Sequence, residues 1–367
     1  MGKMSARAGL TAAAAGLALA LSAGPVQAAG SSGWQVAYRS SSATADPLSS
    51  VTAPSAGDAW AVGVSVSGST AQPVILHWDG SSWSPVTVPG TSGFRPGLVE
   101  SSSADDVWVF GYGSSGPQAL VWNGSTWCTV ALRASFGGGP AAVVNSTDVW
   151  AAASSSCSAG TCTTAVWHWD GTSWASSQVN GFLQGITSAG SAAWLVTLTS
   201  VHNPNTNPTG RPAIYGSTGD QLQPVASPAT RIGTDAGLAA SPAGQLWLLG
   251  PPAASKDPSL LFHWNGQSWS QSAIPAKVSG SSEPFIVNYA PTYDGRRGIW
   301  AGPYAHWTGT RWRNTNQTAS LPGNDSFALL AVASIPGSAS IWAAGWAGRS
   351  PSNNTQDSLI AAYGGLP

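Results

Sequence analysis

The sequence predicts an all-β protein, a seven-bladed β-propeller of four-stranded antiparallel blades. Three observations predict this fold. One unit recurs seven times along the chain, each unit contains short apolar stretches separated by turn residues, and the two ends of the chain supply different parts of one unit. Together they predict a ring in which the N-terminal strand completes the C-terminal blade.

The recurring unit contains two segments marked by tryptophan. An x-Trp-Ala-x-Gly segment is followed by a variable stretch and then by a His-Trp-Asp-Gly-x-x-Trp segment, with variations from unit to unit. The first tryptophans of successive units are 48, 42, 44, 53, 53 and 42 residues apart, which is close to the ~40 to 50 residues of one propeller blade. These tryptophans are Trp60, Trp108, Trp150, Trp194, Trp247, Trp300 and Trp342.

The pattern inside each unit indicates strands. Apolar or alternating residues run for short lengths between Gly, Pro, Ser and Asp, which is typical of strands and turns and not of a helical period. Asp79 and Gly80 favour a tight hairpin turn, because glycine adopts a positive φ without strain. The four strands predicted in the first unit are Leu48–Pro54, Ala59–Val66, Val74–Trp78 and Trp83–Val88.

The ends of the chain predict how the ring closes. The last unit stops at residues 361–365, before the final strand that the other units contain. The segment Gly30–Val36 matches Gly80–Val86, the start of a final strand, with one residue inserted. We therefore expect the first strand of the mature chain to complete the last blade, which removes the open sheet edges that promote aggregation.

Residues 1–28 have the features of a signal peptide. Lys3 and Arg7 precede an apolar run from Ala8 to Leu21, and Ala28 ends a small-residue cleavage pattern. We expect cleavage after Ala28, a secreted and extracellular protein, and a propeller domain over residues 29–367. No later apolar segment is long enough to span a bilayer, so membrane insertion is not expected. A monomer is expected.

Composition excludes several partners. Charged residues make up 8% of the chain and the formal net charge is -1, so no basic stripe is present to neutralise phosphates and nucleic acid is not an expected partner.

Cys157 and Cys162 can join the two arms of a hairpin in an exported chain, which leaves Cys128 as a buried free thiol. No histidine stands at ligand spacing beside the cysteines, so neither a metal nor another cofactor is expected.

Two segments of the first unit carry a family resemblance. Asp58–Gly63 and His77–Trp83 resemble the tandem repeats of secreted actinobacterial β-propeller proteins, and they are distantly similar to kelch and sialidase-type propellers. The resemblance covers essentially all of the mature chain and implies the fold without implying an activity. The Asp-box of sialidase-like families is not matched, because Asp79 and Gly80 are adjacent here, and the double glycine of kelch repeats is absent.

Residues that recur from unit to unit are interpreted as structural. A catalytic or metal site needs groups that converge, whereas these groups are dispersed around the ring. Of the five histidines, only His202 lies outside the repeat. The recurring residues are the histidines His77, His168, His263 and His306, and the turn residues Asp58, Asp106 and Asp148 that precede the first tryptophans.

Candidate ligand-binding residues lie on one predicted face of the ring, which carries the second-to-third loops and the crossings between blades. These segments vary in length, and functional groups concentrate on loops held by a rigid scaffold. Amides, carboxylates and arginines beside aromatic rings suit a hydroxyl-rich ligand, and for any single residue a solvated loop role is the alternative. The candidates are Asp46, Phe94, Arg95, Arg133, Phe136, Phe182, His202, Arg231, Asp235, Glu283 and Asp325.

Three functions fit these observations. The first is a module that binds an extracellular glycan or another cell-surface ligand, and the second is a scaffold that binds a secreted or cell-surface protein. The third is a glycosidase or lyase with its site at the mouth of the central channel. Hydrolysis needs two carboxylates, and Asp235 with Glu283 is the best pair. The sequence favours binding over catalysis, because it shows no Ser-His-Asp set, phosphate loop or metal cluster.

Overall fold

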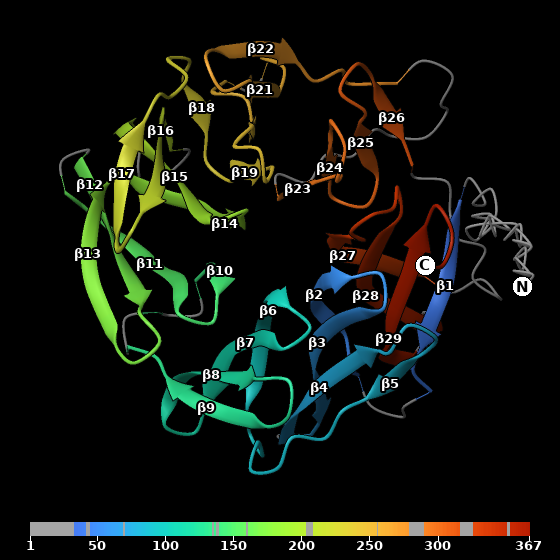
Figure 1. Cartoon of the computed structure of the whole chain (residues 1–367). Coiled ribbons are helices and arrows are strands. Elements are labelled where there is room, and N and C mark those ends of the chain that lie inside the picture. The colour runs from blue at the N-terminus through green and yellow to red at the C-terminus, as the bar shows by residue number, and fades with distance from the viewer. Residues whose placement is uncertain are drawn as a thin grey trace, which may run out of the picture. The chain divides into compact units, whose positions relative to one another are not determined.

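In the computed structural model the chain forms seven antiparallel sheets, arranged as blades around a central channel (Figure 1). The sequence prediction of an all-β, seven-bladed propeller is confirmed. The described residues contain no α-helix, and hence none long and apolar enough to cross a membrane. The structure describes residues 33–41, 45–68, 70–133, 136, 139–158, 161–202, 208–254, 256–278, 290–315, 326–350 and 353–367. The predicted signal peptide lies outside these residues.

Each blade runs outward from the channel through four strands, numbered here by blade from 1 to 7. The innermost strands are β2 (Leu48–Ser55), β6 (Arg95–Ser103), β10 (Ala141–Asn145), β14 (Phe182–Ala189), β19 (Gly237–Ala240), β23 (Pro291–Tyr293) and β27 (Phe327–Ser334). The second strands are β3 (Asp58–Ser67), β7 (Asp106–Gly113), β11 (Asp148–Ser158), β15 (Ala192–His202), β20 (Leu246–Gly250), β24 (Ile299–Ala301) and β28 (Ile341–Ser350).

The two outer positions complete the blades. The third strands are β4 (Thr70–Trp78), β8 (Gly116–Trp122), β12 (Thr161–Trp169), β16 (Thr209–Thr218), β21 (Leu260–Trp264), β25 (Ala305–Trp307) and β29 (Asn353–Tyr363). The outermost are β5 (Trp83–Pro85), β9 (Trp127–Ala131), β13 (Trp174–Asn180), β17 (Gln221–Val225), β22 (Trp269–Ala273), β26 (Trp312–Asn314) and, in blade 7, β1 (Trp34–Arg39). In blade 4 a short strand, β18 (Ile232–Gly233), also pairs with β16.

The predicted closure is present in blade 7. Strand β1 pairs antiparallel with β29, and Trp34 lies opposite Tyr363. The indole Nε1 of Trp34 also donates a hydrogen bond of 2.9 Å to the carbonyl oxygen of Thr315, at the end of blade 6. The guanidinium of Arg39 contacts the buried carboxylate of Asp357 at 3.0 Å. The first strand therefore fastens two blades as well as completing one sheet.

The core lies between neighbouring blades. Seven clusters of buried apolar side chains join the blades in succession around the ring. In the cluster between blades 7 and 1, the ring centroids of Trp83 and Trp342 are 5.2 Å apart in an edge-to-face arrangement. Each buried ring removes a large apolar area from water and so stabilises the contact between blades. The tryptophan repeat is thus a packing repeat.

Glycine at the end of the x-Trp-Ala-x-Gly segment is required by a close backbone approach. A Cβ on Gly63 would overlap the carbonyl oxygen of Pro47, and one on Gly345 would overlap that of Ala328. In both blades the pairing of the innermost strand shifts register at this point. The shift brings the strand against the glycine.

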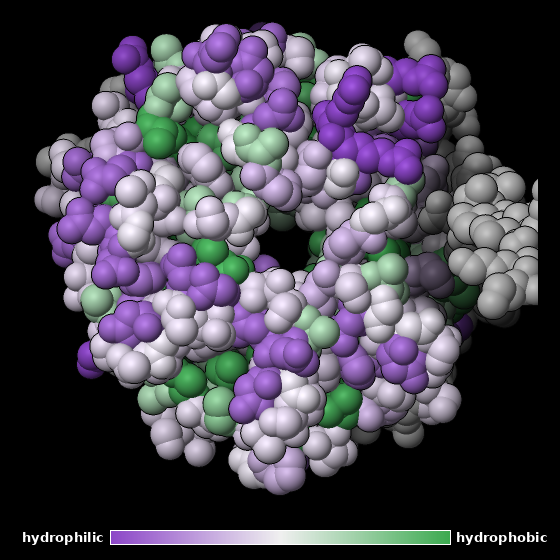
Figure 2. Space-filling view, viewed as in Figure 1, coloured by the Kyte–Doolittle hydropathy of each residue, from purple (hydrophilic) through white to green (hydrophobic). Residues whose placement is uncertain are grey.

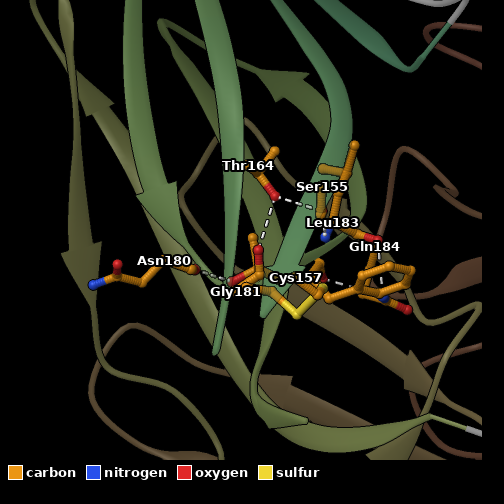
Figure 3. Close-up of a disulfide and its surroundings, with 10 residues drawn as sticks. Ser155, Cys157, Thr164, Asn180, Gly181, Leu183 and Gln184 are labelled. Atoms are coloured by element: carbon orange, nitrogen blue, oxygen red, sulfur yellow. Dashed lines mark hydrogen bonds between the residues drawn. A yellow bond between two sulfur atoms is a disulfide. The ribbon is translucent and has the colours of Figure 1, made fainter. Parts of the chain in front are cut away.

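The cysteines only partly match the prediction. Cys157 and Cys162 form a disulfide between the arms of the β11–β12 hairpin (Figure 3). The neighbouring hydroxyl of Ser155 accepts the amide hydrogen bond of Leu183 at 2.7 Å, which ties this hairpin to the first strand of blade 4. The prediction of a buried thiol at Cys128 is wrong. Cys128 is free and exposed, because it lies on the outermost strand β9.

Candidate functional site

The central channel is a cavity lined by described residues of all seven blades. The innermost strands enclose a volume of about 1060 Å³, and Figure 2 shows the opening at the centre of the ring. Its wall consists mainly of backbone, small apolar side chains and hydroxyls. The serine and threonine residues lining it are Ser49, Ser50, Thr52, Ser101, Thr187, Ser188, Thr292 and Ser334.

Glu100 breaks the pattern of this wall. It lies on β6 opposite Trp108, the first tryptophan of its unit. The residues that pair with the first tryptophan in the other six blades are all alanine or threonine. They are Thr52, Ala142, Thr187, Ala239, Thr292 and Ala333. Glu100 is therefore a single carboxyl group in a ring of small side chains.

The surroundings of Glu100 change its acidity. Glu100 lines the channel and is half-buried, and its carboxyl group has no hydrogen-bond or ionic partner within the described part of the chain. Burial raises the pKa of Glu100 to about 8, because the ionised form loses hydration without gaining a compensating charge. At neutral pH the group is mostly protonated, so it can donate one hydrogen bond and accept others.

Asp235 lines the same channel from its opposite side. It is exposed and stands two residues before the start of β19. It has a positive φ of 68°, which aspartate tolerates better than most residues. The next residue is held in place, because the amide of Ala236 donates a hydrogen bond of 3.1 Å to Oε1 of Gln184. The amide group of Gln184 is itself fixed by a 2.8 Å bond to the carbonyl oxygen of Leu183. Asp235 is thus presented by an ordered loop.

Three of the other predicted site residues are buried. Phe94 and Phe136 are each only 1% exposed and belong to the hydrophobic clusters on either side of blade 2. Their rings pack between blades and offer no face to a ligand, which corrects their predicted role as stacking platforms. Asp46 is also buried and accepts hydrogen bonds from the hydroxyl of Ser40 and the amide of Ser358. Burial raises its pKa despite these bonds.

The remaining candidates are scattered. Arg95 and Arg133 are exposed and do not line the channel. Arg231 donates hydrogen bonds to the carbonyl oxygens of two strand residues in blade 4, and Phe182 packs against the cluster between blades 4 and 5. Glu283, Asp325 and the side chain of His202 lie outside the described residues. Of the predicted set, the structure places Asp235 in the channel with Glu100, a residue that the sequence analysis did not select.

The repeated histidines form clusters with tryptophan and aspartate. His77 stacks on Trp60 with ring centroids 4.1 Å apart, and its Nε2 lies 3.0 Å from Asp58. The same carboxylate accepts a 2.8 Å hydrogen bond from the indole of Trp60. Asp58 therefore bridges two side chains and is more than the turn residue that the sequence indicated. Blade 3 repeats this arrangement with His168, Trp150 and Asp148.

In blade 5 the stacked histidine and tryptophan have no aspartate partner. His263 stacks on Trp247, but its Nε2 and the indole nitrogen have no hydrogen-bond partner. Burial lowers the pKa of His263. The stack persists where the aspartate is missing, which supports a packing role for this histidine position. Among the described residues, no group of three His, Cys, Asp or Glu is arranged to hold a metal ion.

Comparisons with known proteins reveal shared fold only. No protein-family model matches the chain, and no curated protein matches it. It is similar to the structure of YCF48 bound to D1 peptide, with 14% identity over 90% of this chain and 96% of that one and a TM-score of 0.52. A chain from a structural study of two prolyl endopeptidases matches with 13% identity over 83% of this chain and 46% of that one, at a TM-score of 0.50. The structure of SapL1 lectin in complex with alpha methyl fucoside matches with 15% identity over 76% of this chain and 97% of that one, at a TM-score of 0.45. The first two likenesses support the propeller fold.

Proposed function

We propose that the protein is a secreted binding module that holds a hydroxyl-rich ligand, most simply a glycan, in the mouth of the central channel. The observation that carries the proposal is the unmatched carboxyl group of Glu100 in a hydroxyl-rich wall. A protonated carboxyl group can both donate and accept hydrogen bonds. Hydroxyls of the wall that already donate to neighbouring strands can still accept hydrogen bonds from a sugar. The signal-peptide pattern of residues 1–28 supports secretion.

Binding fits the spacing of the two channel acids better than hydrolysis does. Asp235 precedes Ala239 by four positions, and Ala239 occupies the same ring position as Glu100. At a strand rise of about 3.3 Å per residue, four positions correspond to roughly 13 Å along the strand direction. Blades 2 and 5 also lie across the channel from each other (Figure 1). Glycoside hydrolysis needs carboxyl groups about 5 to 9.5 Å apart, so these two residues suit separate contacts along one ligand.

The test is binding of the secreted chain to a panel of neutral oligosaccharides by calorimetry. Glu100→Thr installs the residue that blade 1 has at this position, and we expect it to weaken binding roughly three- to tenfold, as for one lost hydrogen bond. Asp105→Asn is the matched control, because Asp105 is exposed in a turn away from the channel. No binding to any oligosaccharide, or equal losses in both variants, contradicts the proposal.

A peptide panel separates the scaffold alternative from glycan recognition. A propeller of the same fold is known in complex with a peptide, and a channel of this size admits an extended chain. Binding of peptides that Glu100→Thr weakens, with oligosaccharides inert, would assign the channel to a protein partner.

A further inference from the structure

Four arginines gather on blade 6. Arg296 and Arg297 lie in the turn between β23 and β24, Arg311 lies in the turn between β25 and β26, and Arg313 lies on β26. All four are exposed, and the chain has only 14 lysines and arginines in total. The two turns touch, because a Cβ added to Gly309 would lie 3.2 Å from the Cβ of Arg297. Figure 2 shows strongly hydrophilic residues over this blade. We call these four residues the arginine patch.

The patch is absent from the equivalent turns of the other blades. Arg311 and Arg313 flank Trp312, and in blades 1, 2, 3 and 5 the corresponding residues are neutral. Thr308 opens the same turn, where those blades have an aspartate or an asparagine. The neutral pairs are Ser82 and Ser84, Thr126 and Cys128, Ser173 and Ala175, and Ser268 and Ser270, and the opening residues are Asp79, Asn123, Asp170 and Asn265. Blade 6 therefore carries positive charge at two positions where these four blades have neutral residues.

The charge of the patch is not neutralised within the described residues. None of its guanidinium groups forms an ion pair there. The acid of the first turn, Asp294, is engaged elsewhere. Its Oδ1 accepts the backbone amides of Arg296, Arg297 and Gly298 at 2.8 to 3.0 Å, and its Oδ2 lies 3.0 Å from Nε2 of His306. Backbone bonds therefore fix the turn while the arginine side chains face solvent.

The chemistry of the patch selects among anionic partners. Clustered guanidinium groups bind sulfate, phosphate and carboxylate through paired, charge-assisted hydrogen bonds. A protein interface needs an apolar centre, yet in the described residues every exposed large hydrophobic side chain lies outside residues 290–315. Single-stranded nucleic acid needs accessible aromatic rings for stacking. Trp300 and Trp312 are buried, and the half-buried ring of Trp307 packs against Trp312 and the cluster between blades 5 and 6. An anionic polysaccharide needs neither feature.

We propose that the arginine patch binds an anionic polysaccharide, on the face of the ring opposite the channel mouth that Asp235 occupies. The turns of the patch follow an innermost strand, whereas Asp235 precedes one, so the two sites lie at opposite ends of the blades. The patch is thus a second binding surface, independent of the proposed channel site.

The experiment measures binding of the secreted chain to immobilised dextran sulfate, with neutral dextran as the uncharged reference. Arg311→Ser with Arg313→Ser gives blade 6 the residues of blade 1, and Arg296→Ser with Arg297→Ser removes the other half of the patch. We expect each pair to lower affinity roughly ten- to a hundredfold, as for two hydrogen bonds of ordinary strength at an exposed site. Added salt should weaken binding by the native chain, and neutral dextran should not bind.

A matched control carries the same change in charge. Arg95→Ser with Arg133→Ser removes two exposed arginines from other blades and should leave dextran sulfate binding within about twofold. Equal losses in the control, or native affinity in both patch variants, would overturn the proposal. Tighter binding to polyglutamate or to a single-stranded oligonucleotide than to dextran sulfate would overturn the ligand class. Glu100→Thr should leave dextran sulfate binding intact, which keeps this test separate from that of the channel.

Discussion

Blade 1 and blade 6 build the same internal contact from different positions in the chain. In each, a histidine stacks on the first tryptophan and its Nε2 lies 3.0 Å from an aspartate. The aspartate of blade 1, Asp58, stands two residues before Trp60 on β3, whereas Asp294 of blade 6 follows β23 and stands six residues before Trp300. The contact between the side chains is retained although its sequence spacing is not.

The outer surfaces of these two blades keep the same residue spacing but differ in charge. Their final hairpins align residue for residue through the pairs Trp78–Trp83 and Trp307–Trp312. Blade 1 carries Asp79 there, fully exposed, and hydrogen bonds from Ser81 and Ser82 lower its pKa to about 2. Blade 6 replaces this acid and its neighbours with threonines and arginines. The interior of a blade is therefore conserved by packing, and its turns are free to acquire charge.

The largest expected effect comes from a residue that touches blade 6 and not blade 1. Trp34→Ala removes a buried ring and the hydrogen bond to Thr315, and should lower the free energy of unfolding by about 3 to 5 kcal/mol. Hydrogen exchange should accelerate first around blade 6 and only later in blade 1. Uniform acceleration around the ring would show that the closing strand does not hold blade 6 preferentially.

The two aspartates should differ in their contribution to stability. Asp294→Ala leaves three backbone amides and His306 without their acceptor, whereas Asp58→Ala affects Trp60 and His77. We expect losses of about 2 to 4 kcal/mol and about 1 to 2 kcal/mol, measured by urea denaturation. A larger loss for Asp58→Ala would mean that the side-chain cluster outweighs the turn.

Glu100 extends the comparison to a group that neither blade has, since blade 1 has Thr52 and blade 6 has Thr292 at its position. Its pKa of about 8 exceeds that of an unfolded glutamate, so the folded state binds the extra proton and stability falls as pH rises toward 8. We expect a loss of about 1 to 2 kcal/mol between pH 6 and 8 in the native chain. Glu100→Gln should remove most of this slope. The same slope in both proteins would assign it to another group.

The smallest effect on stability is expected for exchanging the surface residues of the two blades. Arg311→Ser with Arg313→Ser, and the reciprocal Ser82→Arg with Ser84→Arg, change exposed side chains only. Each pair should shift the free energy of unfolding by no more than about 0.5 kcal/mol, measured by thermal melting. A large loss for the arginine variant alone would indicate that the arginine patch stabilises blade 6.

The fold could be predicted from the sequence because every blade repeats the same pattern of strands and buried side chains. The tryptophan spacing predicted the number of blades, and the match between Gly30–Val36 and Gly80–Val86 predicted the pairing of β1 with β29. Asp294 was not predicted as a partner of His306, because it reaches the histidine from the turn after β23 and breaks the repeat spacing.

The site could be predicted less well, because the burial of loop residues depends on how the crossings between blades fold. Phe94 and Phe136 stand in crossings that suggested exposure, yet both rings turn inward between blades. Glu100 did carry a signal in the sequence. It stands eight residues before Trp108, where the same offset from Trp60 and Trp300 gives Thr52 and Thr292. Comparing each unit position by position for a single outlier would have found it.

The pairing of β1 with β29 also constrains the order of events during folding. Arg39 and Asp357 meet across 318 residues of chain, whereas the strands within blades 1 to 6 pair with near neighbours. Closing so long a loop carries a large entropic cost, and distant contacts form slowly. Blades 1 to 6 can form from local pairings, but blade 7 has to wait for both ends. Joining residue 367 to residue 33 and opening the chain before β2 should make every blade local and speed the final step.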